Sequence, residues 1–190
     1  MVKVKICGLK RPVDIESVNT EKPDYIGFVF AESKRKVTPE RAAELRKLLN
    51  CNIIPVGVFV DESIENIFSM VYNNVIDVIQ LHGSESEEYI RELKQLTGKP
   101  VIKASGNSRS ADFLLFDNAI PGSGQMFDWA TIEKTDKPFF LAGGLHAGNV
   151  TEAIKKNAPY AVDVSSGVET GGVKDPAKIK EFIRRARNEY

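Results

Sequence analysis

Residues 2–8, VKVKICG, open the chain with apolar side chains at every second position. This alternation predicts a short strand with two different faces, and the glycine at its end allows the chain to turn away. One face carries Val2, Val4 and Ile6, and the other carries Lys3, Lys5 and Cys7. Because the apolar face should pack under helices, Cys7 is predicted to point into the interior at the end of the strand.

Further along the chain, strand-like runs alternate with amphipathic stretches that begin at typical helix caps. The predicted strands are residues 2–6, 25–30, 53–60, 75–81, 100–104, 113–116, 139–142 and 161–164. The predicted helices are residues 12–20, 38–49, a segment after Asp61 or Ser63, a segment from 84–88 onward, 129–134, 148–156 and 175–188.

Eight strand-like runs joined by crossovers predict a single-domain α/β protein, a parallel (β/α)8 TIM barrel over residues 1–190. The fifth βα unit is shortened, because residues 105–111 are fewer than the ~10–12 that a crossover with a helix needs. An open, doubly wound sheet is the alternative.

Composition excludes several classes of partner. Lys plus Arg equals Asp plus Glu, at 26 each, which gives no electrostatic reason to expect nucleic acid or a membrane. No long apolar segment is present, which favours the cytoplasm. Two cysteines and two histidines without ligand spacing predict that there is no metal site.

In such barrels, reactive groups follow the carboxyl ends of strands. That rule selects Cys7, Arg35, His82, Asp128 and the glycine-rich turns after the last two strands. Each has a simpler interpretation: a small buried thiol for Cys7, a solvated basic loop for Arg35, a core-edge ring for His82 and a helix cap for Asp128. Cys51 precedes its strand, so it belongs to the opposite rim and a disulfide with Cys7 is not expected.

Strand alternation places Lys5 beneath Cys7 inside the barrel, where an ammonium group requires a counter-charge. Asp163 is the predicted partner, because the eighth strand lies beside the first once the barrel closes.

Two glycine-rich turns predict a phosphate site. Their backbone N–H groups can converge on an anion, and barrels often hold a phosphate between the loops after strands seven and eight. An ordinary turn is the alternative for each glycine pair. The residues concerned are Gly143, Gly144, Ser166 and Gly167.

Taken together, the motifs resemble those of the phosphoribosylanthranilate isomerase family of tryptophan biosynthesis. They run in order along the whole chain: KICGLKRPVD, IGFVFAESKRKV, VGVFV, VIQLHG, FDW, LAGGL and VDVSSGVETGGVKD. KICG near the start together with DVSSGVE near the end is the most specific combination.

The resemblance implies an aldose–ketose isomerase that converts N-(5-phosphoribosyl)anthranilate to 1-(2-carboxyphenylamino)-1-deoxyribulose 5-phosphate without a cofactor. Asp128 would be the general acid that opens the ribose ring, and Cys7 the general base that takes the C2 proton. Arg35 would contact the anthranilate, with Lys5, His82 and Asp163 in support. A thiolate base implies a lowered thiol pKa.

One departure is Gln125, where the family usually has a lysine before FDW. Indole-glycerol-phosphate synthase, a related lyase, works with lysine and glutamate and lacks KICG and FDW. A sugar isomerase of histidine synthesis has aspartate where Cys7 stands. A phosphosugar-binding barrel without activity is the non-catalytic alternative. The sequence does not predict the oligomeric state.

Overall fold

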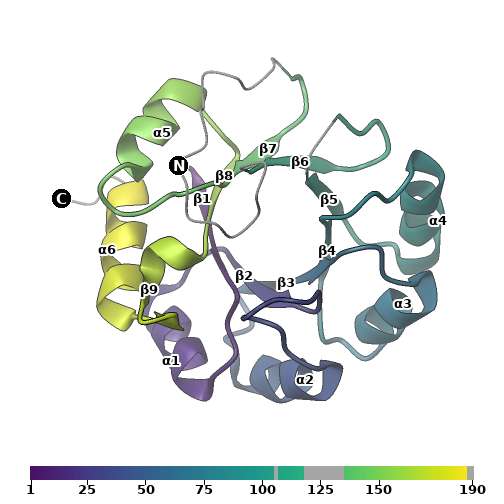
Figure 1. The fold of residues 1–190 in the computed structure, drawn as a ribbon, viewed down its shortest axis with the longest axis horizontal. Helices are drawn as coiled ribbons and strands as arrows, with labels where there is room; N and C mark the ends of the chain where they lie inside the picture. The colour runs from purple at the N-terminus through teal and green to yellow at the C-terminus, as the bar shows by residue number, and fades with distance from the viewer. Residues whose placement is uncertain (105–106, 118–134, 188–190) are drawn as a thin grey trace.

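The computed structural model describes residues 1–104, 107–117 and 135–187. Within these residues, parallel strands β1 to β8 follow one another around a closed barrel, and β8 pairs with β1 (Figure 1). The predicted (β/α)8 barrel is confirmed, and the open sheet is wrong. The strands are β1 (Lys3–Cys7), β2 (Tyr25–Val29), β3 (Ile54–Phe59), β4 (Val78–Leu81), β5 (Val101–Ala104), β6 (Phe113–Phe116), β7 (Phe139–Leu141) and β8 (Ala161–Val164).

Helices surround the barrel, and their starts follow ordinary capping chemistry (Figure 1). Thr38, Ser63, Ser86 and Asp175 each accept a hydrogen bond from a backbone N–H in the first turn of the helix that follows. Ser63 rather than Asp61 therefore caps the third helix. The helices are α1 (Pro12–Glu21), α2 (Pro39–Leu48), α3 (Ile64–Tyr72), α4 (Glu87–Thr97), α5 (Val150–Asn157) and α6 (Pro176–Ala186). Among these helices, none has the length and apolar character that crossing a membrane requires.

The fifth unit is short, as predicted. The described residues between β5 and β6, 107–112, contain no helix. Lys94 of α4 binds Asp112 at 2.7 Å, and Lys137 donates to the carbonyl oxygens of Arg109 and Ala111. These ion-pair and hydrogen-bond contacts hold the connection against the barrel. The predicted helix at 129–134 lies outside the described residues.

Two separate apolar clusters fill the molecule. The larger one lies between barrel and helices and includes Val4 and Ile6 of β1. The smaller one fills the barrel itself with side chains such as Tyr25, Val56 and Phe140. The predicted alternation of β1 is confirmed, since Val4 and Ile6 pack outward and Lys5 is fully buried among inward-facing strand residues.

A small hairpin after β8 is the main element that the sequence analysis did not predict. A 3-10 turn, η2 (Ser166–Val168), leads into the antiparallel strands β9 (Glu169–Thr170) and β10 (Val173–Lys174). Gly171 and Gly172 join the two strands, and both have positive φ. The hairpin brings Glu169 and Lys174 back to the rim where β1 ends.

Candidate active site

Cys7 is the last residue of β1 and is 8 % exposed. Its neighbour on β2 is Gly27, and a Cβ on Gly27 would stand 2.6 Å from the Cys7 Sγ atom. Only glycine leaves room for the thiol at this register. Cys51 is exposed, and both cysteines are free, in agreement with the predicted absence of a disulfide.

Lys5 lies one inward position below Cys7 and is fully buried. Its Nζ donates to Asp163 Oδ2 at 2.6 Å and to Gln80 Oε1 at 2.9 Å. The strand register explains the ion pair, because Lys5 and Asp163 face each other across the β1–β8 pairing. The predicted Lys5–Asp163 ion pair is confirmed.

Burial raises the pKa of the Cys7 thiol above its ordinary value, while the positive charges of Lys5 and Lys174 act in the opposite direction. The lowered thiol pKa that a thiolate base implies is therefore not found. For Lys5, burial favours the neutral amine, but the charge of Asp163 and the hydrogen bond to it outweigh this effect and raise the pKa. Lys5 is a permanent cation beneath a thiol that is largely protonated at neutral pH.

Arg35 reaches the same rim from the loop after β2. Its guanidinium makes two hydrogen bonds to Glu169 of β9, at 2.7 and 2.8 Å. The arginine side chain crosses Gly8 so closely that a Cβ on Gly8 would stand 2.5 Å from the Arg35 Cδ atom. Arg35 is thus 20 % exposed and fixed beside Cys7, which excludes the interpretation as a freely solvated loop residue.

Lys174 of β10 connects the Arg35–Glu169 ion pair to β1. Its Nζ lies 2.6 Å from Glu169 Oε1 and donates to the Ser165 carbonyl oxygen at 2.8 Å. The Ser165 hydroxyl in turn donates to the carbonyl oxygen of Cys7 at 3.0 Å. Burial lowers the pKa of Lys174 even though Glu169 opposes this effect. A cation, an anion and a second cation therefore surround the end of β1.

The two glycine turns lie next to each other at this rim. Gly143 and Gly144 follow β7 with positive φ, and Asn149 holds their loop by donating to the Gly144 carbonyl oxygen at 3.0 Å. A Cβ on Gly167 would overlap the carbonyl oxygen of Leu145, so the loops after β7 and β8 touch through their backbones. Ser166 and Gly167 begin η2, so the structure brings together the four residues predicted to hold phosphate.

His82 directly follows β4 and contacts Gln80, which in turn binds the buried Lys5 in the barrel interior. Gln80 Nε2 lies 3.3 Å from the His82 Nδ1 atom. Burial lowers the pKa of His82, and the charge of Lys5 lowers it further, so the ring is neutral. Asp128, Gln125 and the FDW motif lie outside the described residues.

The family model for N-(5'-phosphoribosyl)anthranilate (PRA) isomerase matches residues 4–185 of the chain. The chain belongs to this isomerase family. A relative from Endomicrobium trichonymphae with that name is 49 % identical over 199 residues, covering 99 % of this chain and 100 % of its own. The family resemblance seen in the motifs is confirmed, and the chain is an isomerase of tryptophan biosynthesis.

Solved structures of the isomerase family have the same fold. The enzyme from Thermotoga maritima superimposes with a TM-score of 0.89 at 37 % identity, covering 99 % of this chain and 100 % of its own. A second isomerase structure, at 35 % identity and TM-score 0.85, covers the same shares of the two chains. It is a complex with reduced 1-(o-carboxyphenylamino)-1-deoxyribulose 5-phosphate.

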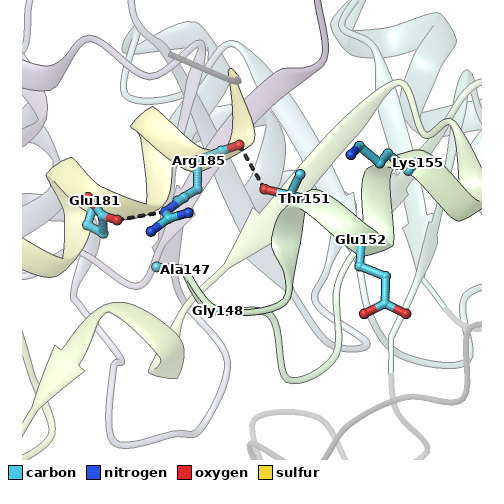
Figure 2. Close-up of a pocket in the computed structure, with 7 residues that line it drawn as sticks. All are labelled: Ala147, Gly148, Thr151, Glu152, Lys155, Glu181 and Arg185. Atoms are coloured by element: carbon cyan, nitrogen blue, oxygen red, sulfur yellow. Dashed lines mark hydrogen bonds and ion pairs between the residues drawn. The ribbon is translucent and has the colours of Figure 1, made fainter. Parts of the chain in front are cut away.

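A pocket of about 570 Å³ lies away from this rim, between the start of α5 and the end of α6 (Figure 2). Two of its charged side chains bind each other, since Arg185 donates to Glu181, and the Arg185 carbonyl oxygen accepts from Thr151. It contains none of the residues predicted to bind or convert the substrate. Among the described residues, no cluster of three His, Cys, Asp or Glu side chains is arranged to hold a metal ion.

Sequence reasoning missed three polar residues of the isomerase rim: Gln80, Glu169 and Lys174. Gln80 could have been predicted, because it lies two residues before His82 and strand alternation therefore directs both side chains into the barrel. Gly171-Gly172 between two short runs is a signal for a two-residue hairpin, which would have placed Glu169 opposite Lys174. Ser165 belongs to the glycine-rich turn after the eighth strand, which the rule for reactive groups at strand ends had selected.

Proposed function

We propose that the chain catalyses the Amadori rearrangement of N-(5-phosphoribosyl)anthranilate to 1-(2-carboxyphenylamino)-1-deoxyribulose 5-phosphate. The observation that supports this proposal is the position of Cys7 at the rim, between a fixed arginine and two touching glycine loops. The reduced product bound in a related isomerase has the same chemical parts: a phosphate, a sugar chain and an aromatic carboxylate.

In the first step, Asp128 gives its proton to the ribose ring oxygen, the bond from that oxygen to C1 breaks, and the anthranilate nitrogen forms a Schiff base with C1. The role of Asp128 rests on its FDW motif. Cys7, as thiolate, then removes the C2 proton, and the electron pair moves toward the protonated nitrogen to give an enol-amine. Protonation at C1 and loss of the C2 hydroxyl proton yield the ketone. The substrate nitrogen donates its electron pair when the ring opens and, as the protonated Schiff base, serves as the electron sink when C2 is deprotonated.

The raised thiol pKa means that Cys7 acts through a small thiolate fraction at neutral pH. Lys5 limits this disadvantage by placing a cation below the sulfur. The backbones of Gly143, Gly144, Ser166 and Gly167 would hold the phosphate, and Arg35 would contact the anthranilate. Activity without a metal or organic cofactor, a cytoplasmic location and the absence of nucleic acid as a partner belong to the same proposal.

The test is to mix the purified protein with phosphoribosylanthranilate in a buffer that contains a metal chelator. We expect the anthranilate fluorescence to decrease. Cys7→Ser and Asp128→Asn should each lower kcat by a factor on the order of 10² or more. Cys51→Ser is the matched control, because this exposed cysteine lies at the opposite rim. Turnover like that of the unmodified enzyme in either active-site variant would overturn the role assigned to that residue.

A further inference from the structure

Three polar side chains form a connected row inside the barrel, and the row ends at a ring nitrogen. Lys5 of β1 donates to Gln80 Oε1 of β4 at 2.9 Å. The amide nitrogen of Gln80 lies 3.3 Å from His82 Nδ1. Gln80 is 2 % exposed, so neither end of its amide exchanges these partners for bulk water.

The hydrogen-bond directions along this row are fixed by chemistry. An ammonium group has donors and no acceptor, so the atom of Gln80 that faces Lys5 must be the amide oxygen. The amide nitrogen then faces His82 and donates, which requires His82 Nδ1 to be the acceptor. In a neutral imidazole, an accepting Nδ1 leaves the ring proton on Nε2.

The protonated Nε2 has no partner among the described residues, although it is buried. Within residues 1–104, 107–117 and 135–187, the closest carboxylate oxygen is Asp117 Oδ2 at 3.9 Å, which is beyond hydrogen-bond distance. Asp163 Oδ1 is a second buried atom that has no hydrogen-bond partner in the described part of the chain. Leaving a buried donor unpaired is energetically unfavourable, which indicates that another group accepts this hydrogen bond when the enzyme works.

We propose that neutral His82 donates its Nε2 proton in a hydrogen bond to an oxygen atom of the bound substrate. Gln80 is the positioning residue that sets this tautomer. The substrate half of the inference rests on the proposed function, whereas the tautomer half does not. His82 follows β4, which lies on the opposite side of the barrel from β8. If the loops after β7 and β8 hold the phosphate, the rest of the substrate extends across the barrel mouth toward His82.

The tautomer decides between two roles for His82. A general base at the rim would need Nε2 without a proton, so that it could take one from the substrate. A donor needs the proton already there. Because Gln80 occupies Nδ1 as a donor, the structure assigns His82 as a donor and leaves Cys7 as the base.

Nitrogen-15 NMR of the histidine rings tests the tautomer directly, because the chain contains only His82 and His146. His146→Gln removes one ring and assigns the spectrum. We expect the Nε2–H tautomer for His82 in the unmodified protein at neutral pH. An Nδ1–H tautomer, or a rapidly averaging mixture, would overturn the assignment without any variant at the site.

Gln80→Glu tests the positioning role in a near-isosteric side chain. A carboxylate offers only acceptors, so it should move the ring proton to Nδ1 or hold a second proton on His82. An unchanged Nε2–H tautomer in a folded Gln80→Glu variant would exclude Gln80 as the residue that sets it. Glu85→Gln is the control, because it changes a nearby charge without touching the Gln80 amide.

The reduced product bound in the related structure is the probe for the substrate half. At saturation it should shift the Nε2–H signal of His82 and slow the exchange of this proton with water, and no change would overturn the donor role. In kinetics, His82→Gln places an N–H near the Nε2 position and should keep KM within a few-fold, whereas His82→Asn should raise it about 10-fold. If the probe shifts the signal while turnover is absent, the proposed function fails and the donor assignment stands.

Discussion

The Lys5 ammonium lies 2.6 Å from the Asp163 carboxylate in the barrel interior, directly below the end of β1. Neither group reaches water to a useful extent, since their side chains are 0 % and 8 % exposed. Such a pair contributes little net stability relative to apolar side chains, yet removing one partner leaves an uncompensated buried charge. Its position under Cys7 gives the ion pair an electrostatic role at the thiol as well.

The first prediction separates these two roles of Lys5. Lys5→Met should lower the free energy of unfolding by about 3–5 kcal/mol in urea denaturation, because Asp163 is left charged and unpaired. Lys5→Met combined with Asp163→Asn should recover a large part of that loss. Turnover should stay low in both proteins, since the thiol has lost its cation. Recovery of kcat in the double variant would show that Lys5 acts on stability alone.

The second prediction concerns the ionisation of Cys7. In Cys51→Ser the remaining thiol is Cys7, and its thiolate absorbance should appear with a midpoint above the ordinary cysteine value, because burial raises the pKa. The thiol-free Cys7→Ser, Cys51→Ser protein supplies the baseline. Adding Lys174→Met should move the midpoint to higher pH, since Lys174 favours the thiolate. The exposed Lys180→Met is the matched control, and an equal shift from it would refute the specific effect of Lys174.

The sequence predicts those contacts of the site that follow from the alternation of side chains along paired strands. The Lys5–Asp163 pair followed from alternation on two strands that closure makes neighbours, and β6 and β8 have the predicted ends. Strand β4 is shorter than the predicted 75–81 because Val75 still donates back to Met70 of α3, which makes its first residues part of the helix exit.

Contacts between loops at the rim could not be predicted from the sequence, for a physical reason. Arg35 lies on an irregular loop and Glu169 on the two-residue strand β9, 134 positions away, so no periodicity relates them. The thiol pKa depends on the balance between burial and several charges, and sequence supplies neither distance nor exposure. The expected lowering therefore failed, although the nearby cation was correctly predicted.

The third prediction tests Glu169 as the residue that fixes Arg35. Glu169→Gln removes a charge-assisted, two-bond contact with the guanidinium, and KM should rise by a factor on the order of 10. Glu181→Gln breaks a similar carboxylate–arginine contact on the outer face of α6 and should leave KM unchanged. Additive effects of Glu169→Gln and Arg35→Ala in a double variant would contradict a shared role.

Acid stability provides a fourth prediction about the same carboxylate. Burial opposes ionisation of Glu169, but hydrogen bonds from Arg35 and Lys174 prevail and hold its pKa at about 2. A carboxyl with a depressed pKa stabilises the fold above its unfolded pKa, and this contribution is lost as pH falls toward about 2. The stability difference between the parent protein and Glu169→Gln should therefore shrink over that window in urea titrations. A difference independent of pH would contradict it.

The last prediction concerns the room that Gly27 leaves for the thiol. In Gly27→Ala the new Cβ would stand 2.6 Å from Cys7 Sγ, so the thiol must shift within a well-packed interior. Because a misplacement of about 1 Å can cost a factor of 10² in rate, kcat should fall by a factor on the order of 10 to 10², with a smaller effect on KM. Gly148→Ala is the matched control, since its Cβ would meet only the edge of the His146 ring. If Gly27→Ala turns over as fast as Gly148→Ala, the position of the Cys7 sulfur does not limit the reaction, and its assignment as the base would need revision.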